Sequence, residues 1–185
     1  MSCKKIKAAV SIIIVKPNAP NDAQVLLIER SKNKNDPWSG HMAFPGGRYQ
    51  DNDQDILSTA IRETLEEIGL DLRKESSFFE SNKKNHIPRL SDVKTLKIHE
   101  KNIVVTPFLF GLKKKPEIVI NKEVQQVVWI PLKFFLESKN RKYSNFKING
   151  EVLSLPCYFY NDKVIWGITL SMIDEIFENL DKLFI

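Results

Sequence analysis

The chain has little cysteine and little histidine. Its two cysteines, Cys3 and Cys157, stand far apart in 185 residues. They form no paired-cysteine pattern, which argues against a disulfide framework and against a cysteine-based zinc site. The three histidines also lack the spacing of metal ligands. We expect both cysteines to be reduced thiols.

The sequence also lacks a hydrophobic run long enough to cross a membrane. The longest apolar stretches, "AAVSIIIV" and "VVTPFLFGL", are far shorter than a membrane span and consist of good strand formers. The first 17 residues join charge to an apolar stretch but show no small-residue cleavage site. We therefore expect a cytoplasmic protein without a membrane partner.

Charge of one sign is in modest excess, because the formal net charge is +5. Such an excess fits either an ordinary solvated surface or a field that attracts polyanionic substrates. The most basic run, Lys113 to Lys115, has no interleaved aromatic or arginine residues. A nucleic-acid partner is therefore not expected.

What the chain does have is the composition of a globular domain, with 42% hydrophobic and 28% charged residues. Apolar runs typical of strands alternate with three helix-period segments, and neither a repeat nor a linker divides them. We predict one α/β domain, residues 1–185, with a mixed sheet between helices. The polar stretch 75–95 is predicted as a loop that overhangs a site. The expected strands are 6–16, 24–30, 102–112, 117–130, 150–160 and 163–169, and the expected helices are 54–68, 131–139 and 170–184.

Three glutamates in the first predicted helix are close together. Because each helical residue advances about 100°, Glu63, Glu66 and Glu67 share one face, and we expect all three to point outward. Leu57, Ile61, Thr64, Leu65 and Ile68 are expected on the buried face. Like charges at this spacing destabilise a helix unless a cation offsets them.

A hard divalent cation can offset these charges, because Mg²⁺ prefers carboxylate and phosphate oxygens. An ordinary exposed acidic face is the alternative explanation. The preceding loop "FPGGR" favours the cation, since its two glycines let the backbone approach an ion or ligand closely. Gly69 is the expected helix stop.

This unit resembles the Nudix box, commonly written G-x5-E-x7-R-E-U-x-E-E-x-G-U with U a bulky apolar residue. Residues 62–70, "RETLEEIGL", match its second half. At the front, Gln54 occupies the place of the upstream glutamate, between Asp53 and Asp55. The resemblance implies a Nudix-type α/β/α sandwich.

The surrounding segment "LLIERSKNKNDPWSGHMAFPGGR" is similar to the signature of the coenzyme A diphosphatase subfamily. That signature has L-L-x-x-R-S and then G-x-x-x-F-P-G-G. An arginine that the subfamily often has between these two parts is missing, since "KNKNDPW" stands there. The matching residues are Leu26, Leu27, Arg30, Ser31, Gly40, Phe44, Pro45, Gly46 and Gly47.

The resemblance implies hydrolysis of a diphosphate by positioned water and divalent cations. Glu63, Glu66 and Glu67 are the implied ligands of Mg²⁺ or Mn²⁺, and the Gly47 carbonyl is implied as a further one. Arg62 is implied to brace the glutamates.

The general base is left open between a box glutamate, Glu66 or Glu67, and Glu123, which lies six residues before Trp129. An exposed charge at a strand edge is the plainer interpretation of Glu123.

Substrate contacts are expected from Arg30 and Arg48, whose guanidinium groups suit phosphate oxygens, and from Phe44. Gly46 is expected to act structurally within the motif. For Phe44, ordinary core packing is the alternative.

Coenzyme A or one of its thioesters is the predicted small-molecule substrate, with ADP-ribose, a dinucleotide or a nucleoside triphosphate as alternatives. A catalytically silent nucleotide-binding module is the non-enzyme alternative. The oligomeric state is left open, with a homodimer among the options.

Overall fold

The structure is a computed structural model that describes residues 6–15, 23–34, 38–75, 89–94 and 103–178. At its centre the two longest strands of a mixed sheet run parallel over their whole length. Both are almost entirely buried, as expected of parallel strands that are covered on both faces. The strands of this sheet are β1 (Ile6–Val15), β2 (Gln24–Arg30), β3 (Met42–Ala43), β4 (Gly46–Arg48), β5 (Val93–Lys94), β6 (Ile103–Leu112) and β7 (Val124–Pro131).

The sheet divides between β1 and β2. These strands pair only where Ile14 faces Val25 and Val15 faces Gln24. Farther along, β3 pairs with β2, and β4 pairs with β1. The short segment that joins β3 to β4 therefore crosses from one strand to the other within the sheet. This crossing consists of Phe44 and Pro45, and the two glycines that follow begin β4.

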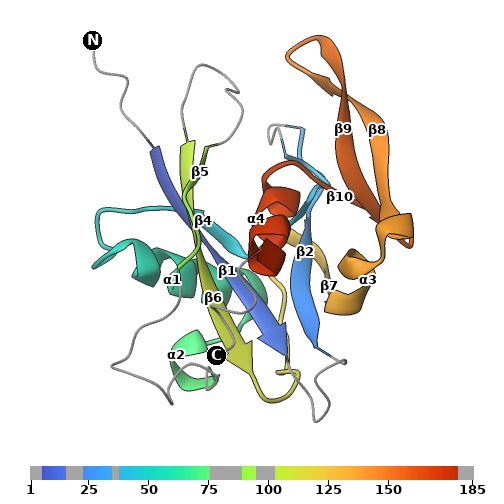
Figure 1. The fold of residues 1–185 in the computed structure, drawn as a ribbon. Helices are drawn as coiled ribbons and strands as arrows, with labels where there is room; N and C mark the ends of the chain where they lie inside the picture. Colours follow the sequence, from blue (N-terminus) through green and yellow to red (C-terminus); the bar gives the residue numbers. More distant parts are fainter. Residues whose placement is uncertain (1–5, 16–22, 35–37, 76–88, 95–102, 179–185) are drawn as a thin grey trace.

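Two helices cover the two faces of the sheet. Helix α1 (Ile56–Ile68) lies on one face, and α4 (Gly167–Glu178) lies on the other (Figure 1). Each face has its own apolar core, because alternate strand residues point to opposite sides. The predicted α/β/α sandwich is confirmed. Among the described residues, no helix is both long and apolar enough for a bilayer crossing.

Helix α1 has clear start and stop signals. The Asp55 side chain accepts a hydrogen bond from the Ser58 backbone N–H, and the Ser58 hydroxyl accepts one from the Asp55 N–H. At the other end Gly69 adopts a left-handed conformation, φ 71°, and its N–H bonds to the Leu65 carbonyl. The predicted stop at Gly69 is confirmed.

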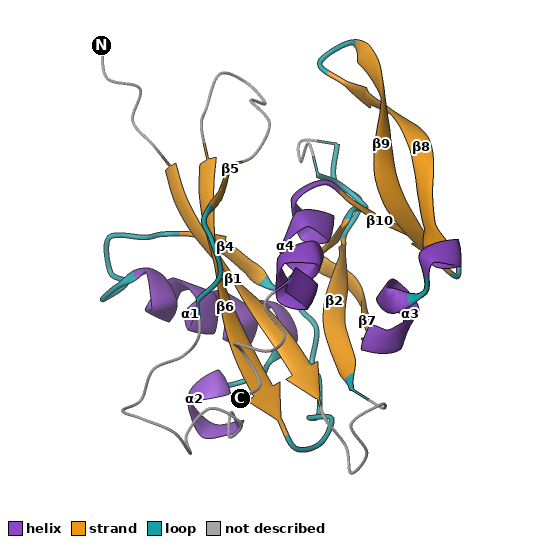
Figure 2. Cartoon of the chain, viewed as in Figure 1, coloured by secondary structure: helices purple, strands orange, loops and turns teal. Residues whose placement is uncertain are grey.

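A second, three-stranded sheet stands beside the central sandwich (Figure 2). It consists of β8 (Arg141–Ile148), β9 (Glu151–Tyr160) and β10 (Lys163–Trp166). The β8–β9 hairpin turns at Asn149 and Gly150, both with positive φ. The strand β8 was not predicted from the sequence, although the Asn-Gly pair between two strand-like runs is a hairpin signal. The short helices are α2 (Leu72–Glu75), α3 (Leu132–Leu136) and a 3-10 turn at Ser138–Asn140.

Several predicted elements have different bounds. Residues 117–123 are not a strand, because this segment instead bonds to the end of α1 through Val119 N–H to Ile68 O and Asn121 N–H to Glu67 O. The predicted strand 163–169 ends at Trp166, where Gly167 begins α4. Most of the predicted loop 75–95 and the chain beyond 178 lie outside the described residues.

Candidate active site

Glu67, in α1, is buried where this helix meets the first residue of β4. Its side chain is 2% exposed, and its Oε2 accepts a hydrogen bond of 2.9 Å from the Gly46 backbone N–H. The expectation that all three glutamates point outward is therefore wrong for Glu67. Leu65, placed on the buried face, is instead 40% exposed. The helix is rotated so that one carboxylate faces the crossing between β3 and β4.

Burial raises the pKa of Glu67 to about 8, because the carboxylate has lost its water. The Gly46 N–H and the positive charge of Arg30 oppose this rise only in part. The negative charges of Glu63 and Glu123 add to it. The site thus holds an excess of negative charge around a desolvated carboxyl group.

The guanidinium group of Arg62 donates hydrogen bonds to three carboxylates. Its Nε donates to Asp53 at 2.8 Å, and its Nη1 donates to Glu63 at 2.8 Å and to Glu66 at 3.1 Å. Its Nη2 also donates to the Arg48 carbonyl. Glu63 is half-enclosed, and burial raises its pKa, whereas the Glu66 side chain is 52% exposed. Arg62 therefore holds two of the predicted ligands in place, as the brace role requires.

Asp53 supplies the acidic group that the front of the box left open. It is buried, and hydrogen bonds from Arg62 lower its pKa, with further hydrogen bonds from the Gln50 N–H and the Thr59 hydroxyl. Asp55, the other candidate, instead begins the helix. The signal was the acidic residue next to Gln54, but only the structure shows which neighbour reaches Arg62.

The two glycines of β4 are needed for different contacts. A Cβ on Gly46 would lie 2.2 Å from the Ala9 carbonyl oxygen, which belongs to the backbone of β1. A Cβ on Gly47 would lie 2.4 Å from the carboxyl carbon of Glu63. Gly46 therefore lets two strands meet, while Gly47 makes room for a carboxylate.

Gly47→Ala is expected to fold and to lose about 10- to 100-fold in activity, because the flexible Glu63 side chain can move aside but leaves its position. Gly46→Ala is expected to destabilise the fold by about 3 kcal/mol, since backbone cannot move as easily. Chemical denaturation and steady-state kinetics on both variants would distinguish these effects. Full activity in Gly47→Ala would show that the Glu63 position does not matter for turnover.

The other predicted site residues are placed around this centre. Arg30 ends β2 near enough for its charge to act on Glu67. Glu123 lies where β7 begins, and its carbonyl accepts the Ser31 N–H at 2.8 Å, which joins it to the end of β2. Phe44 is buried in the core on the α4 face, so its packing is explained without a ligand.

Arg48 has an exposed side chain and contributes its backbone carbonyl to Arg62. Substrate contact by Arg48, and likewise by Phe44, stays a prediction.

A comparison with known protein families identifies the family of this chain. Residues 5–148 match the family described as NUDIX domain, and these residues include the crossing, α1 and β7. The chain belongs to the NUDIX domain family. The box resemblance is thereby confirmed.

Relatives and solved structures agree with this membership. Mitochondrial coenzyme A diphosphatase NUDT8 from Mus musculus is 28% identical over 144 residues, 74% of this chain and 60% of that protein. Nudix hydrolase 22, chloroplastic, from Arabidopsis thaliana is 32% identical over 173 residues, 90% of this chain and 53% of that protein. The chain thus spans 53–60% of the length of these two relatives. Because their names refer to organelles, the expected cytoplasmic location stays a prediction.

Among solved structures, the NUDIX domain of Shewanella oneidensis NrtR, complexed with ADP ribose, superposes with a TM-score of 0.61. It is 17% identical and covers 96% of this chain and 89% of that chain. At this identity the likeness concerns the Nudix fold alone.

The Nudix box of this chain offers oxygen donors around one buried carboxylate. Glu67 has lost its water without gaining a full counter-charge, which a divalent cation would supply. Within the described ranges, however, no three histidine, cysteine, aspartate or glutamate side chains already converge on one point. Glu63 and Glu66 instead turn an oxygen toward Arg62. The donor chemistry of these residues fits Mg²⁺ or Mn²⁺, which prefer carboxylate oxygens.

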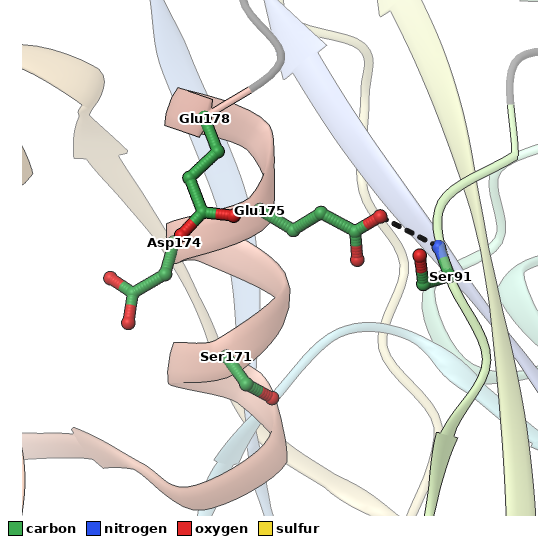
Figure 3. A pocket seen from close by; sticks show the side chains of 5 residues that line it. All are labelled: Ser91, Ser171, Asp174, Glu175 and Glu178. Carbon is green, nitrogen blue, oxygen red and sulfur yellow. Dashed lines mark hydrogen bonds between the residues drawn. The ribbon is translucent and has the colours of Figure 1, made fainter.

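A separate acidic hollow lies on α4, away from the Nudix box (Figure 3). It has a volume of about 470 Å³. Two of its carboxylates already have partners, since Asp174 binds Arg141 and Glu175 accepts the Ser91 N–H. These pairs account for Asp174 and Glu175 as links that hold α4 to its neighbours. The lining residues are Ser91, Ser171, Asp174, Glu175 and Glu178.

Proposed function

We propose that the chain is a metal-dependent hydrolase that cleaves the diphosphate linkage of a nucleoside diphosphate derivative, with coenzyme A or its thioesters as substrates. The observation that carries this proposal is the buried Glu67 carboxylate, held by the Gly46 N–H beside Glu63 and Glu123. A fold has no structural need for this excess of negative charge. The coenzyme A signature of the sequence and the name of the mouse relative support the substrate.

Mg²⁺ or Mn²⁺ would be held by Glu63, Glu66 and Glu67, with the Gly47 carbonyl as a further oxygen ligand. A divalent cation held there would supply positive charge to neutralise the diphosphate and would lower the pKa of a nearby water. Both effects suit a reaction whose main needs are positioning and charge neutralisation.

The residues of the chain itself set the geometry. The Gly46 N–H fixes one oxygen of Glu67, and Arg62 fixes Glu63 and Glu66 until they are needed as ligands. Arg30 brings a positive charge to the side of the site where β2 ends, which suits a phosphate oxygen of the substrate. Arg48 is the second cationic group proposed to contact the substrate.

In the reaction, the oxygen of a water molecule bonds to one phosphorus of the diphosphate, and the bond from that phosphorus to the bridging oxygen breaks. The water loses one proton to a carboxylate, for which Glu123 and the box glutamates Glu66 and Glu67 are the candidates. The bridging oxygen leaves on the other phosphate. With coenzyme A, the products are 4′-phosphopantetheine and adenosine 3′,5′-bisphosphate.

The test is a substrate panel with Mg²⁺ or Mn²⁺ that contains coenzyme A, acetyl-coenzyme A, ADP-ribose, NADH and nucleoside triphosphates. We expect the highest kcat/KM on coenzyme A or its thioester, with the two products above identified by mass spectrometry. The same panel with EDTA serves as the control and should show no turnover.

The panel separates the alternatives. A preference for ADP-ribose, a dinucleotide or a nucleoside triphosphate would overturn the substrate and keep the hydrolase. Turnover of none of them, together with nucleotide binding, would favour a silent binding module.

A further inference from the structure

The β8–β9 hairpin has two different faces. Residues directly opposite each other on paired strands share a face, and successive residues alternate. Phe146 is paired with Leu153, and Cys157 is paired with Trp166, so these four residues lie on one face together with Leu155. The other face begins at Tyr158 and Ile165, which pack in the core, and continues outward to Tyr143 and Val152. We call Phe146, Leu153, Leu155 and Trp166 the apolar strip.

The four side chains of the apolar strip are uncharged and partly open to solvent, and Lys142 and Glu151 lie on the same face of the hairpin. Its rings stack, with 4.0 Å between the centroids of Phe146 and Trp166 and 13° between their planes. Farther out, Leu153 remains 38% exposed. The hairpin extends well beyond the sandwich (Figure 1). Its first strand has eight residues, which corresponds to about 25 Å.

The strip begins next to the candidate active site. Trp166 meets the ring of His41 edge-on, with 5.2 Å between centroids. The backbone carbonyl of His41 accepts the N–H of Arg30, and Arg30 is the cation that acts on Glu67. An elongated group whose diphosphate lies at the box can therefore pass Arg30 and continue along the strip.

Two polar links hold the strip in place from behind. Lys163, in β10, forms a 2.9 Å ion pair with the buried Glu29, which is the neighbour of Arg30 in β2. Arg141, at the start of β8, binds both oxygens of Asp174 in α4 at 2.7 and 2.9 Å. A hairpin attached at both points is held in a fixed position. It can therefore discriminate between ligands of different length.

We propose that the apolar strip binds the acyl chain of the substrate, a coenzyme A thioester. This inference rests on the proposed function and adds selectivity for acyl chain length. Three observations favour this occupant: the strip begins at Trp166, which contacts His41 beside Arg30, its four side chains are apolar, and its length suits an extended acyl chain. Apolar contacts along the strip lower KM and leave the reacting phosphates untouched.

The test compares Leu153→Ser with Val152→Ser. These neighbours lie on opposite faces of β9, and both are solvent-accessible, so serine should leave the hairpin folded in each case. KM and kcat are measured with coenzyme A and with octanoyl-coenzyme A. For the parent protein we expect a lower KM for the octanoyl thioester than for coenzyme A.

In Leu153→Ser the KM for octanoyl-coenzyme A should rise about five- to tenfold, as expected for the loss of one apolar side-chain contact. Its kcat and its KM for coenzyme A should stay within about twofold. Val152→Ser should match the parent protein with both substrates.

Several results would overturn the inference. Hydrolysis of both substrates with equal KM would reject the strip and leave the proposed function standing, whereas no hydrolysis of either would reject the proposed function and the inference with it. Equal effects of the two substitutions would indicate a general change of the hairpin. A dimer in sedimentation that Leu153→Ser dissociates, without any change in chain-length preference, would assign the strip to a second copy of the chain.

Discussion

Glu67→Gln is expected to reduce kcat by about 100-fold or more, equivalent to about 3 kcal/mol in activation free energy. Glutamine keeps the size of the side chain and can still accept the Gly46 N–H, but it removes the charge that would bind a divalent cation. The measurement is steady-state hydrolysis of coenzyme A at saturating Mn²⁺, with circular dichroism to verify the fold.

Glu117→Gln is the matched control, because Glu117 is an exposed glutamate in the segment between β6 and β7. It should behave like the parent protein. Parent-like kcat and metal dependence in Glu67→Gln would remove Glu67 from the set of ligands.

The same substitution should make the metal-free protein more stable at high pH. The folded pKa of Glu67, about 8, lies above the ordinary value of 4.5 for a glutamate, so the folded protein holds this proton more tightly. Stability contributed by the protonated group is present below about pH 4.5 and is lost as the pH rises through 8. In EDTA at pH 8.5, we expect Glu67→Gln to exceed the parent protein by about 2 kcal/mol in free energy of unfolding. Near pH 5 the two should be equal.

Urea denaturation at both pH values measures this difference. Added Mn²⁺ should then stabilise the parent protein more than the variant, since a ligand that binds only the folded state stabilises it. A parent protein that is the more stable of the two at pH 8.5 would mean that the buried carboxylate already has sufficient counter-charge.

The local features of the box could be predicted from the sequence. The end of helix α1 at Gly69 follows from local spacing, and the resemblance to the Nudix box implied the contact of Arg62 with the glutamates. The burial of Glu67 could not be predicted in this way. It depends on the angle at which α1 meets β1, where the Ser11 hydroxyl bonds to the Ala60 carbonyl at 3.1 Å. Helical spacing places side chains around an axis but does not say which direction faces the sheet.

The partner of Arg62 illustrates the same limit. Asp53 and Asp55 are two positions apart. From the sequence, either could have supplied the acidic group at the front of the box, where Gln54 replaces the glutamate. The capping bonds of Asp55 to Ser58 commit that residue to the helix start, which leaves Asp53 for Arg62. The strand β8 was missed for a different reason. Its polar and apolar residues alternate weakly, and its stability comes from pairing with β9 and from the Arg141–Asp174 link.

Arg62→Lys is expected to destabilise the protein by about 3 kcal/mol, because it breaks a largely buried ion-pair network. A lysine cannot reproduce the planar fork that reaches Asp53, Glu63 and Glu66 together. Activity should also fall, since two proposed ligands lose their anchor. The measurements are urea denaturation at pH 7 and coenzyme A hydrolysis without urea.

Arg73→Lys is the matched control for this change. Arg73 also pairs with an aspartate, Asp71, but its side chain is 65% exposed, so the pair is solvated and screened. The control should change the free energy of unfolding by less than about 0.5 kcal/mol. The contrast isolates the burial of the network from the general effect of replacing arginine by lysine. Equal, small effects at both positions would mean that solvent, rather than Arg62, balances the charge of Asp53, and the fixed positions of Glu63 and Glu66 would then need another cause.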